Sequence, residues 1–245
     1  MRASPAASAC AFLLLLAIPS AEARVFLRTG GAGSGIVDPG AFGWDTAYQT
    51  SMSINGGRAE LATWSAPEAL STAVKRLREA CQRRNVAALF FASGDLAWGL
   101  ASGDGRVVRF LLTASGGGRQ SLVFAVDQSA DDYRLSAQRP TSHLLREVPP
   151  FPQSTPDLYV ADDGTATAVE ISRSPVEPQQ IRAHYESALP AAGWALAPPQ
   201  RVGSASAAVY VKDNQLCVLL IKSTGFDGGS VITLMHKRQN LAAPP

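Results

Sequence analysis

The sequence predicts an α+β fold made of two tandem ββαβββ repeats, each a mostly antiparallel sheet with one helix on one face. The first observation behind this prediction is an internal repeat. Residues 55–86 and 163–194 show the same order of turn, strand and helix patterns at an offset of 108. The second observation is that an offset of 109 aligns a later strand pattern, RVVRFLLTAS, with QLCVLLIKST. We therefore expect the first repeat at residues 47–128 and the second at residues 155–238.

Each repeat is expected to begin with a hairpin and to continue into one amphipathic helix. INGG and ADDGT are hairpin turn sequences, because Asn, Asp and Gly tolerate a positive φ. We expect the first helix at Ser65–Gln82 with Ser65 as N-cap, and the second at Pro175–Ala191 with Ser174 in that role. Apolar residues at helical spacing predict the buried stripes, which are Leu70, Ala73, Val74, Leu77, Ala80 and Cys81 in the first helix and Ile181, Tyr185, Ala188 and Leu189 in the second.

The stretch HYESALPAAGW closes the second helix. Gly193 suits the left-handed conformation that commonly ends a helix. Trp194 follows directly, and we expect its ring to cover the end of the core. Three strands are expected after each helix, with turns at GDGR and SGGGR in the first repeat and at KDNQ and FDGG in the second.

Residues 1–23 have the pattern of a secretory signal peptide. A cationic start precedes the short apolar core ACAFLLLLAI, and AEA then has the form of a cleavage site. We expect cleavage after Ala23 and export to the periplasm or the outside of the cell as a soluble chain. Cys10 precedes the apolar core, so it does not fit the position of a lipidated cysteine. No later apolar run is long enough to span a membrane.

Three further segments are expected outside the repeats. Residues 24–46 form a flexible Gly-rich segment, and its RTGGAGSGIVDPG run lacks the Gly-Lys-Ser/Thr ending of a phosphate-binding loop. Residues 129–154 form a Pro-rich linker that we expect to be extended rather than helical, and residues 239–245 form a tail. Leu145, Phe151 and their apolar neighbours are too apolar to remain exposed to water. The linker is therefore expected to lie along one repeat and to fix the arrangement of the two.

The composition excludes several classes of function. The 245-residue chain carries a net charge of only +2, which argues against nucleic acid as the main partner. The three histidines, His143, His184 and His236, are far apart and no two of them stand at a metal-ligand spacing, so we expect no metal site. Acidic residues near the second hairpin, at positions 157, 162 and 163, lack a calcium-loop pattern and are interpreted as turn and entry residues. We expect no catalytic residues and no cofactor.

Two cysteines remain after the signal peptide, Cys81 and Cys217. In an oxidising compartment, a disulfide between the two is one alternative. Both also fall at apolar-periodic positions, so the alternative is two separate buried thiols. Sequence alone does not supply the Cα separation that decides between them.

Two surface features suggest a binding role. KRLREACQRRN concentrates positive charge toward the end of the first helix, where cations also favour the helix dipole. The binding residues that we select from it are Arg76, Arg83 and Arg84, with an anionic surface or an acidic partner as ligand. The strand LCVLLIK, residues 216–222, is apolar on both faces and needs cover on each. We expect the sister repeat to supply that cover, with a partner protein as the alternative.

The run VPPFPQSTPDLYV, together with HYESALPAAGW, resembles a small α+β module of many secreted or envelope-attached bacterial proteins. The resemblance covers the second half of the chain, because the first repeat has Asn85-Val86 in place of Gly-Trp and lacks the Pro-aromatic-Pro entry. It implies an exported domain of unassigned activity and brings no catalytic residues.

These observations favour an exported, non-catalytic bacterial envelope protein that acts as a binding or adaptor module. Its partner would be another exported or envelope protein, for example in a secretion, pilus or surface assembly. The alternative is a hydrolase of an envelope polymer, whose Ser, His and Asp residues are brought together only by folding. A base within hydrogen-bond reach of a nucleophile in a deep cleft would favour the hydrolase, whereas an open sheet edge or apolar patch would favour the adaptor.

Overall fold

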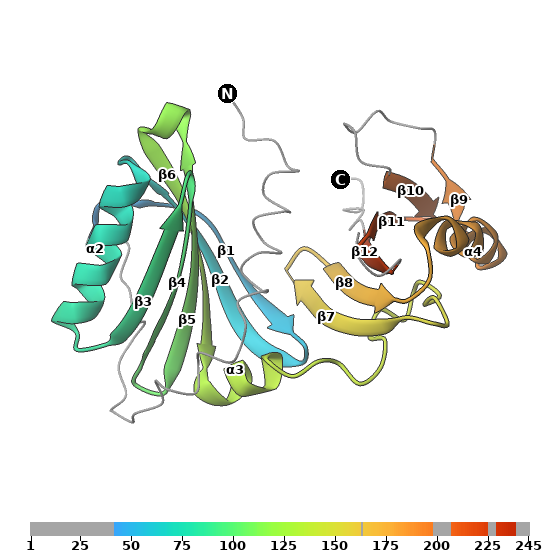
Figure 1. Cartoon of the computed structure of the whole chain (residues 1–245), viewed down its shortest axis with the longest axis horizontal. Helices are drawn as coiled ribbons and strands as arrows, with labels where there is room; N and C mark the ends of the chain where they lie inside the picture. The colour runs from blue at the N-terminus through green and yellow to red at the C-terminus, as the bar shows by residue number, and fades with distance from the viewer. Residues whose placement is uncertain (1–41, 163, 198–206, 225–228, 239–245) are drawn as a thin grey trace, which may run out of the picture. The chain divides into compact units, whose positions relative to one another are not determined.

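The computed structural model describes residues 42–162, 164–197, 207–224 and 229–238 (Figure 1). It divides into two compact units, of which unit 1 comprises Met1–Ser51 and Gly57–Ala137 and unit 2 comprises Met52–Gly56 and Gln138–Pro245. Three α-helices and twelve strands are described, and every described strand pair is antiparallel, so the predicted α+β class is confirmed. The expected signal peptide, most of the expected Gly-rich segment and the expected tail lie outside the described residues.

Unit 1 is an antiparallel sheet with the strand order β3-β4-β5-β6-β2-β1. Helix α2 lies along one face of this curved sheet, and α3 lies at the end of β6 (Figure 1). Its elements in chain order are β1 (Asp45–Ile54), β2 (Gly57–Ala66), α2 (Leu70–Arg83), β3 (Ala87–Ser93), β4 (Leu96–Gly103), β5 (Arg106–Ser115), the 3₁₀ turn η3 (Gly116–Gly118), β6 (Gln120–Ser129) and α3 (Ala130–Ser136).

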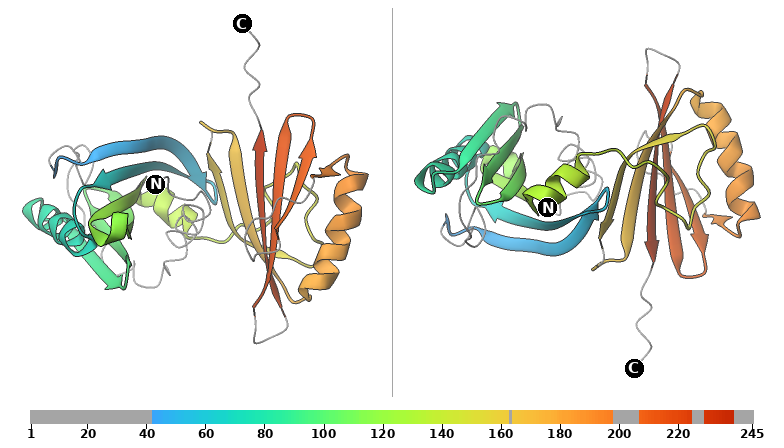
Figure 2. Two further views of the ribbon diagram at one scale, coloured as in Figure 1. Left: turned by 90° about the horizontal axis from the view of Figure 1, so that it is seen from above. Right: turned by 90° about the horizontal axis from the view of Figure 1, so that it is seen from below.

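Unit 2 has the strand order β7-β8-β12-β11-β10-β9, with α4 along one face (Figure 2). Residues Met52–Ile54, which belong to this unit, pair with β7 opposite β8. The elements in chain order are β7 (Thr155–Asp162), β8 (Thr167–Ser174), α4 (Pro178–Ala191), β9 (Ala195–Leu196), β10 (Ala207–Lys212), β11 (Gln215–Ser223) and β12 (Ser230–Arg238).

The expected count of three strands after each helix is wrong, because each unit has four. In unit 1 the strand that was missed is β3, whose sequence AALFFAS is a short apolar run without clear alternation. Such a run directly after a helix stop gives no period by which to recognise a strand. In unit 2 it is the two-residue strand β9.

Both helices begin later than expected. Ser65 and Ser174 are not N-caps but lie in β2 and β8, where they pair with Leu122 and Ser230 in the sheet ladder. The N-cap residues are Ala69 and Glu177, and neither side chain makes a cap hydrogen bond. Both serines therefore remain in the strands instead of capping the helices, because pairing in the sheet satisfies their backbone N–H and C=O groups.

Two buried serines tie the helix entries to the sheets in the same way in both units. In unit 1 the Ser121 hydroxyl donates to the Glu68 carbonyl at 2.9 Å. In unit 2 the Ser230 hydroxyl donates to the Val176 carbonyl at 2.7 Å. Each bond satisfies a carbonyl in the short connection between the second strand and the helix, where the backbone has left the ladder.

The helix ends confirm the expected left-handed stop. Gly193 has φ +86°, and Asn85 occupies the corresponding place after α2 with φ +54°. The Val86 amide then donates to the Cys81 carbonyl at 2.8 Å, and the Trp194 amide donates to the Leu189 carbonyl at 3.0 Å. This pattern satisfies carbonyls at the end of each helix.

Each unit has its own core beneath its helix. All six residues of the predicted α2 stripe are buried, and in α4 Ile181, Tyr185 and Leu189 are buried while Ala188 is half-buried. Trp194 lies in the unit 2 core, as expected. Cys81 and Cys217 are free thiols buried in different cores, so the two-thiol alternative is the one the structure shows. Burial raises the pKa of Cys81 to about 11 and that of Cys217 to about 12.

The expected linker is not extended throughout, because α3 occupies Ala130–Ser136. The Ser129 hydroxyl accepts from the Asp132 amide at 3.0 Å, and two aspartates occupy the first turn. This N-cap outweighs the prolines, all of which come later in the segment. Beyond α3, Leu145, Val148 and Phe151 are buried in the unit 2 core, which confirms that this stretch lies along one unit.

Candidate functional site

Strand β3 forms one edge of the unit 1 sheet, and among the described strands it is bonded on one side only, to β4. The turn between them has two residues, so Ser93 and Leu96 form a hydrogen-bonded pair. Alternation along the strand then leaves the backbone N–H and C=O groups of Ala88, Phe90 and Ala92 pointing away from β4. β3 contains no charged residue and no proline, the usual devices that prevent an edge from pairing with another chain.

The two faces of β3 differ. Phe90 is buried beneath α2, whereas Phe91 on the other face is 45% exposed. The Phe91 ring stacks on Trp98 of β4, with ring centroids 5.9 Å apart and planes inclined by 23°. The edge therefore combines outward backbone groups, of which the Phe90 carbonyl accepts from Arg78, with an exposed aromatic surface, which is the arrangement that strand addition requires.

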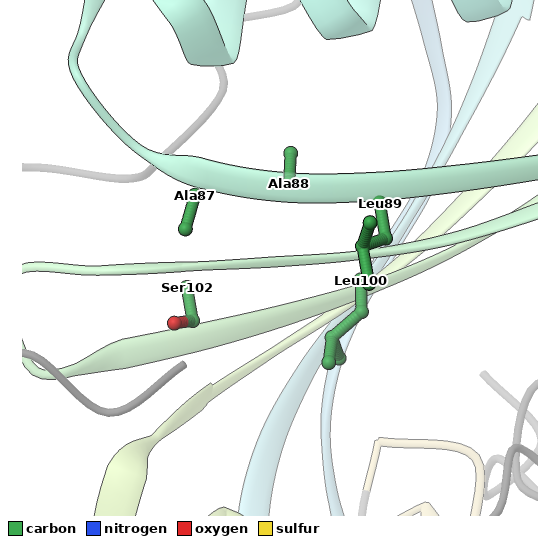
Figure 3. Close-up of a pocket in the computed structure, with 5 residues that line it drawn as sticks. All are labelled: Ala87, Ala88, Leu89, Leu100 and Ser102. Atoms are coloured by element: carbon green, nitrogen blue, oxygen red, sulfur yellow. The ribbon is translucent and has the colours of Figure 1, made fainter. Parts of the chain in front are cut away.

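A shallow hollow lies beside this aromatic pair and is lined by Ala87, Ala88, Leu89, Leu100 and Ser102. Figure 3 shows Ala88 directed toward the helix layer and Ala87 directed to the opposite side of β3. The lining is almost entirely apolar and carries no charge. Its position on the Phe91 face extends the apolar surface along the edge.

Gly99 on β4 explains how this edge is built. It pairs with Phe90, and a Cβ atom at position 99 would lie 2.3 Å from the Phe90 ring. The absence of a side chain therefore lets Phe90 lie across the neighbouring strand, where its ring packs 5.6 Å from that of Phe110. A glycine in a strand is often such a place of close approach.

Helix α2 places positive charge beside the β3 edge. Arg78 Nη2 donates to the Phe90 carbonyl over 3.5 Å, which brings the guanidinium to the outer side of the strand. Lys75 lies one turn before Arg78 on the exposed side of the helix, and its Nζ is 3.9 Å from Glu79, a loose surface pair. β3 and β4 carry no acidic residue, so the positive charge at this edge is not neutralised by the strands.

The residues selected from the sequence are divided between different places. Arg76 lies on the other flank of α2, where it pairs with Glu68 at 3.2 Å and donates to the Phe42 carbonyl at 3.1 Å. Arg83 and Arg84 are exposed at the end of the helix. The residue nearest the edge is Arg78. It belongs to the same basic run, but the sequence did not single it out because the flank facing an edge strand depends on the sheet order.

A second cluster lies in unit 2 around Glu170, which is 2% exposed. Its carboxylate accepts from the amides of Leu144 at 2.8 Å and Leu145 at 3.1 Å, and it lies 2.5 Å from His143 Nδ1. His143 Nε2 is in turn 3.3 Å from the Ser154 hydroxyl. The order serine, histidine, carboxylate matches that of a hydrolytic triad.

The bonds of Ser154 favour a structural role for this cluster. Its hydroxyl donates to the Phe151 carbonyl at 2.6 Å, so the proton that a base would remove points away from His143. His143 Nε2 also lies 3.2 Å from the Ser154 carbonyl. The carboxylate therefore holds residues 143–145 against the unit 2 sheet, and His143 in turn contacts Ser154; we refer to this cluster as the Glu170 clasp.

A third cluster surrounds Arg109 in unit 1, on the sheet face opposite α2. Its Nη2 donates to Gln128 Oε1 at 2.5 Å, and its guanidinium carbon lies 5.5 Å from the centre of the Tyr133 ring. Its Nε atom is buried without a hydrogen-bond partner in the described part of the chain. Burial lowers the pKa of Arg109 to about 10. This is a buried cation held by neutral groups.

The remaining residues considered in the sequence have ordinary surroundings. His184 packs between the rings of Phe151 and Tyr185, and His236 lies 2.9 Å from Gln215 Oε1. Burial lowers the pKa of His236 below its usual value. Asp157 is paired with Arg139 and Arg173, and Asp162 accepts from two amides of the hairpin turn. Residue 163 lies outside the described part.

The described residues contain no group of three or more His, Cys, Asp or Glu side chains that would hold a metal ion. No described helix is long and apolar enough to cross a membrane. In comparisons with known proteins, no family model, curated protein or solved structure matches this chain. The β3 edge is therefore interpreted from its own geometry and charge.

Proposed function

We propose that this chain is an exported, non-catalytic bacterial envelope protein that binds another exported protein as an adaptor. The binding site in this proposal is the β3 edge, which takes an extended segment of the partner as an added strand. The observation that carries the proposal is a seven-residue edge strand that has no charged residue and no proline and whose Phe91 side chain is exposed. Backbone groups would give the affinity, and the Phe91 face would give part of the specificity.

Duplication of one small module is proposed as the origin of the two units. Both have the same strand order, and α4 begins and ends 108 residues after α2. The paired bonds from Ser121 and Ser230 lie at equivalent places, as do the positive φ values of Asp104 and Asp213. The likeness of the second half to secreted bacterial modules and the signal-peptide pattern of residues 1–23 support export to the periplasm or beyond.

The proposal is tested by photo-cross-linking in the producing bacterium. A benzophenone amino acid at Ala87, on the Phe91 face, is expected to cross-link the exported partner. Ala92→Pro should abolish this cross-link, because proline removes an outward N–H while leaving the bonds to β4 intact. Ala92→Ser keeps the N–H and is the matched control. A folded Ala92→Pro chain that cross-links the same protein as Ala92→Ser would contradict strand addition.

A second candidate function is hydrolysis, favoured by the 3.3 Å approach of Ser154 to His143 and by the 2.5 Å contact of His143 with Glu170. In that case Ser154 would be the nucleophile, after rotation of its hydroxyl away from Phe151. A fluorophosphonate probe distinguishes the candidates. Labelling that disappears in both Ser154→Ala and His143→Ala would support a hydrolase, whereas an unlabelled wild-type chain would leave the adaptor function.

A further inference from the structure

We propose that the segment bound at the β3 edge alternates acidic and apolar residues, with its acidic side chains toward α2 and its apolar side chains toward Phe91. This inference rests on the proposed function and names the chemistry of the partner. Successive side chains of a strand point to opposite faces. A strand added to β3 must therefore present one set of side chains to the helix flank and the other to the aromatic face.

The side of the β3 edge that faces α2 favours negatively charged side chains on the added strand. α2 contains four cationic residues and one acidic residue, Glu79. Arg78 is bonded to the Phe90 carbonyl on the outer side of β3, so an added strand would pass directly beside its guanidinium. Glu79 lies about 100° further round the helix than Arg78 and is paired with Lys75, so Arg78 is the cation of α2 that is left to face the edge. Carboxylates on the added strand would gain charge-assisted hydrogen bonds from Arg78 and attraction from Lys75.

The opposite side of the edge selects apolar groups. Leu89 and Phe91 of β3 share this face with Trp98 and Leu100 of β4, and none of the four is charged. A carboxylate placed here would lose hydration without a partner, which is costly. An aliphatic side chain would instead cover Phe91 and lie over the shallow hollow beside Leu89. The two faces therefore require different residues at alternate positions.

The same charges argue against a second copy of this chain as the occupant. Antiparallel pairing of two β3 strands about a twofold axis would bring Arg78 and Lys75 of both copies to the two sides of one seam. Neither β3 nor β4 contributes an acidic residue that would offset this repulsion. An acidic segment would be attracted to these cations, whereas a second copy of the chain would bring more cations beside them.

The test uses fluorescence anisotropy with the mature full chain and three labelled peptides, which alternate Val with Glu, Ser or Lys over seven residues. The Glu-Val peptide is expected to bind at least tenfold more tightly than the Ser-Val peptide in low salt, with the Lys-Val peptide weakest. High salt should reduce the difference. Arg78→Glu should reverse the order of the Glu and Lys peptides. Arg83→Glu makes the same charge change at the exposed helix end and should keep the order.

The outcomes separate this inference from the proposed function. Equal binding of the three peptides, abolished in each case by Ala92→Pro, would overturn the acidic preference and leave strand addition standing. Absence of Glu-Val binding to the wild-type chain would overturn the inference. A concentration-dependent dimer that Ala92→Pro converts to a monomer would identify a second copy as the occupant and would also overturn it. A preserved preference in Arg78→Glu would exclude the helix flank as its source.

Discussion

Units 1 and 2 share one strand order but differ at the edge that follows the helix. In unit 1 this edge is the seven-residue β3, beside a helix with four cationic residues and one acidic residue. In unit 2 the described edge is the two-residue β9, beside a helix with one arginine and one glutamate. Lys212 is the cation near that edge, and it is already bonded to the Ala192 carbonyl at 2.7 Å. Edge length and flank charge, rather than the shared topology, therefore distinguish the candidate binding unit.

A second difference concerns buried polar groups. Unit 1 buries Arg109 among neutral partners, and the equivalent position in unit 2 is the half-buried Val218. Unit 2 instead buries a carboxylate, Glu170, whose hydrogen bonds are well satisfied. The first is expected to cost stability and the second to contribute it. Each difference gives a variant that tests the comparison.

The largest expected effect is on the segment that lies over the unit 2 core. The double variant Leu145→Ser and Phe151→Ser should lower the free energy of unfolding of unit 2 by about 4 kcal/mol, because it removes two buried apolar side chains. Chemical denaturation measures the loss. Leu135→Ser, which changes an exposed leucine of α3, is the control. A double variant as stable as this control would show that the segment is not part of the unit 2 core.

The Glu170 clasp should give the next largest effect. Glu170→Gln weakens two backbone hydrogen bonds and removes the charge opposite His143, so we expect a loss of about 2 to 3 kcal/mol. Residues 138–154 should then be cut faster in limited proteolysis. Glu186→Gln, an exposed glutamate on α4, is the matched control. Equal proteolysis of the two variants would mean that the apolar contacts alone hold the segment.

Replacing Arg109 should make unit 1 more like unit 2. Arg109→Met is expected to leave the free energy of unfolding within about 1 kcal/mol of wild type or to raise it, because the buried cation has no carboxylate partner among the described residues. Thermal and chemical denaturation measure the change. A loss of more than about 3 kcal/mol would show that Gln128 and Tyr133 stabilise the buried guanidinium enough to offset its desolvation.

The smallest effect concerns the thiols, which should behave alike in the two units. Burial raises the pKa of Cys81 and Cys217 above the ordinary value of 9, so the unfolded chain releases these protons at a lower pH than the folded chain. Stability should therefore fall as pH rises from 9 toward 11. Cys217→Ala should reduce that slope relative to wild type, and both thiols should resist Ellman's reagent until the chain unfolds. Rapid labelling of the folded chain at pH 8 would contradict this account.

Local signals predicted much of this fold. The stripes of α2 and α4 were readable because apolar residues recur at helical spacing, and Gly193 marked a helix end because few other residues adopt its φ. The helix starts were misplaced because Ser65 and Ser174 have good N-cap side chains but are held in long-range ladders. α3 was missed because the short capping sequence Ser-Ala-Asp-Asp, residues 129–132, is followed by a proline-rich stretch.

The candidate site was less accessible to sequence reasoning. The edge position of β3 depends on which strands pair across the sheet, and nothing within AALFFAS encodes that order. The basic run was visible, but only the sheet order makes Arg78, rather than Arg76, the residue beside an open edge. The approach of His143 and Ser154 to Glu170 likewise joins residues 11 to 27 positions apart. Such non-local proximity has no periodic signature.

Residue-resolved amide exchange, with and without the Glu-Val peptide, detects strand addition at the β3 edge. In the free mature chain, the amides of Ala88, Phe90 and Ala92 should exchange at least a hundredfold faster than those of Leu89 and Phe91, which are bonded to β4. Saturating peptide should slow the three fast amides at least tenfold and leave Leu89 and Phe91 unchanged. Protection of all five amides in the free chain, or three amides that stay fast with peptide bound, would contradict strand addition at β3.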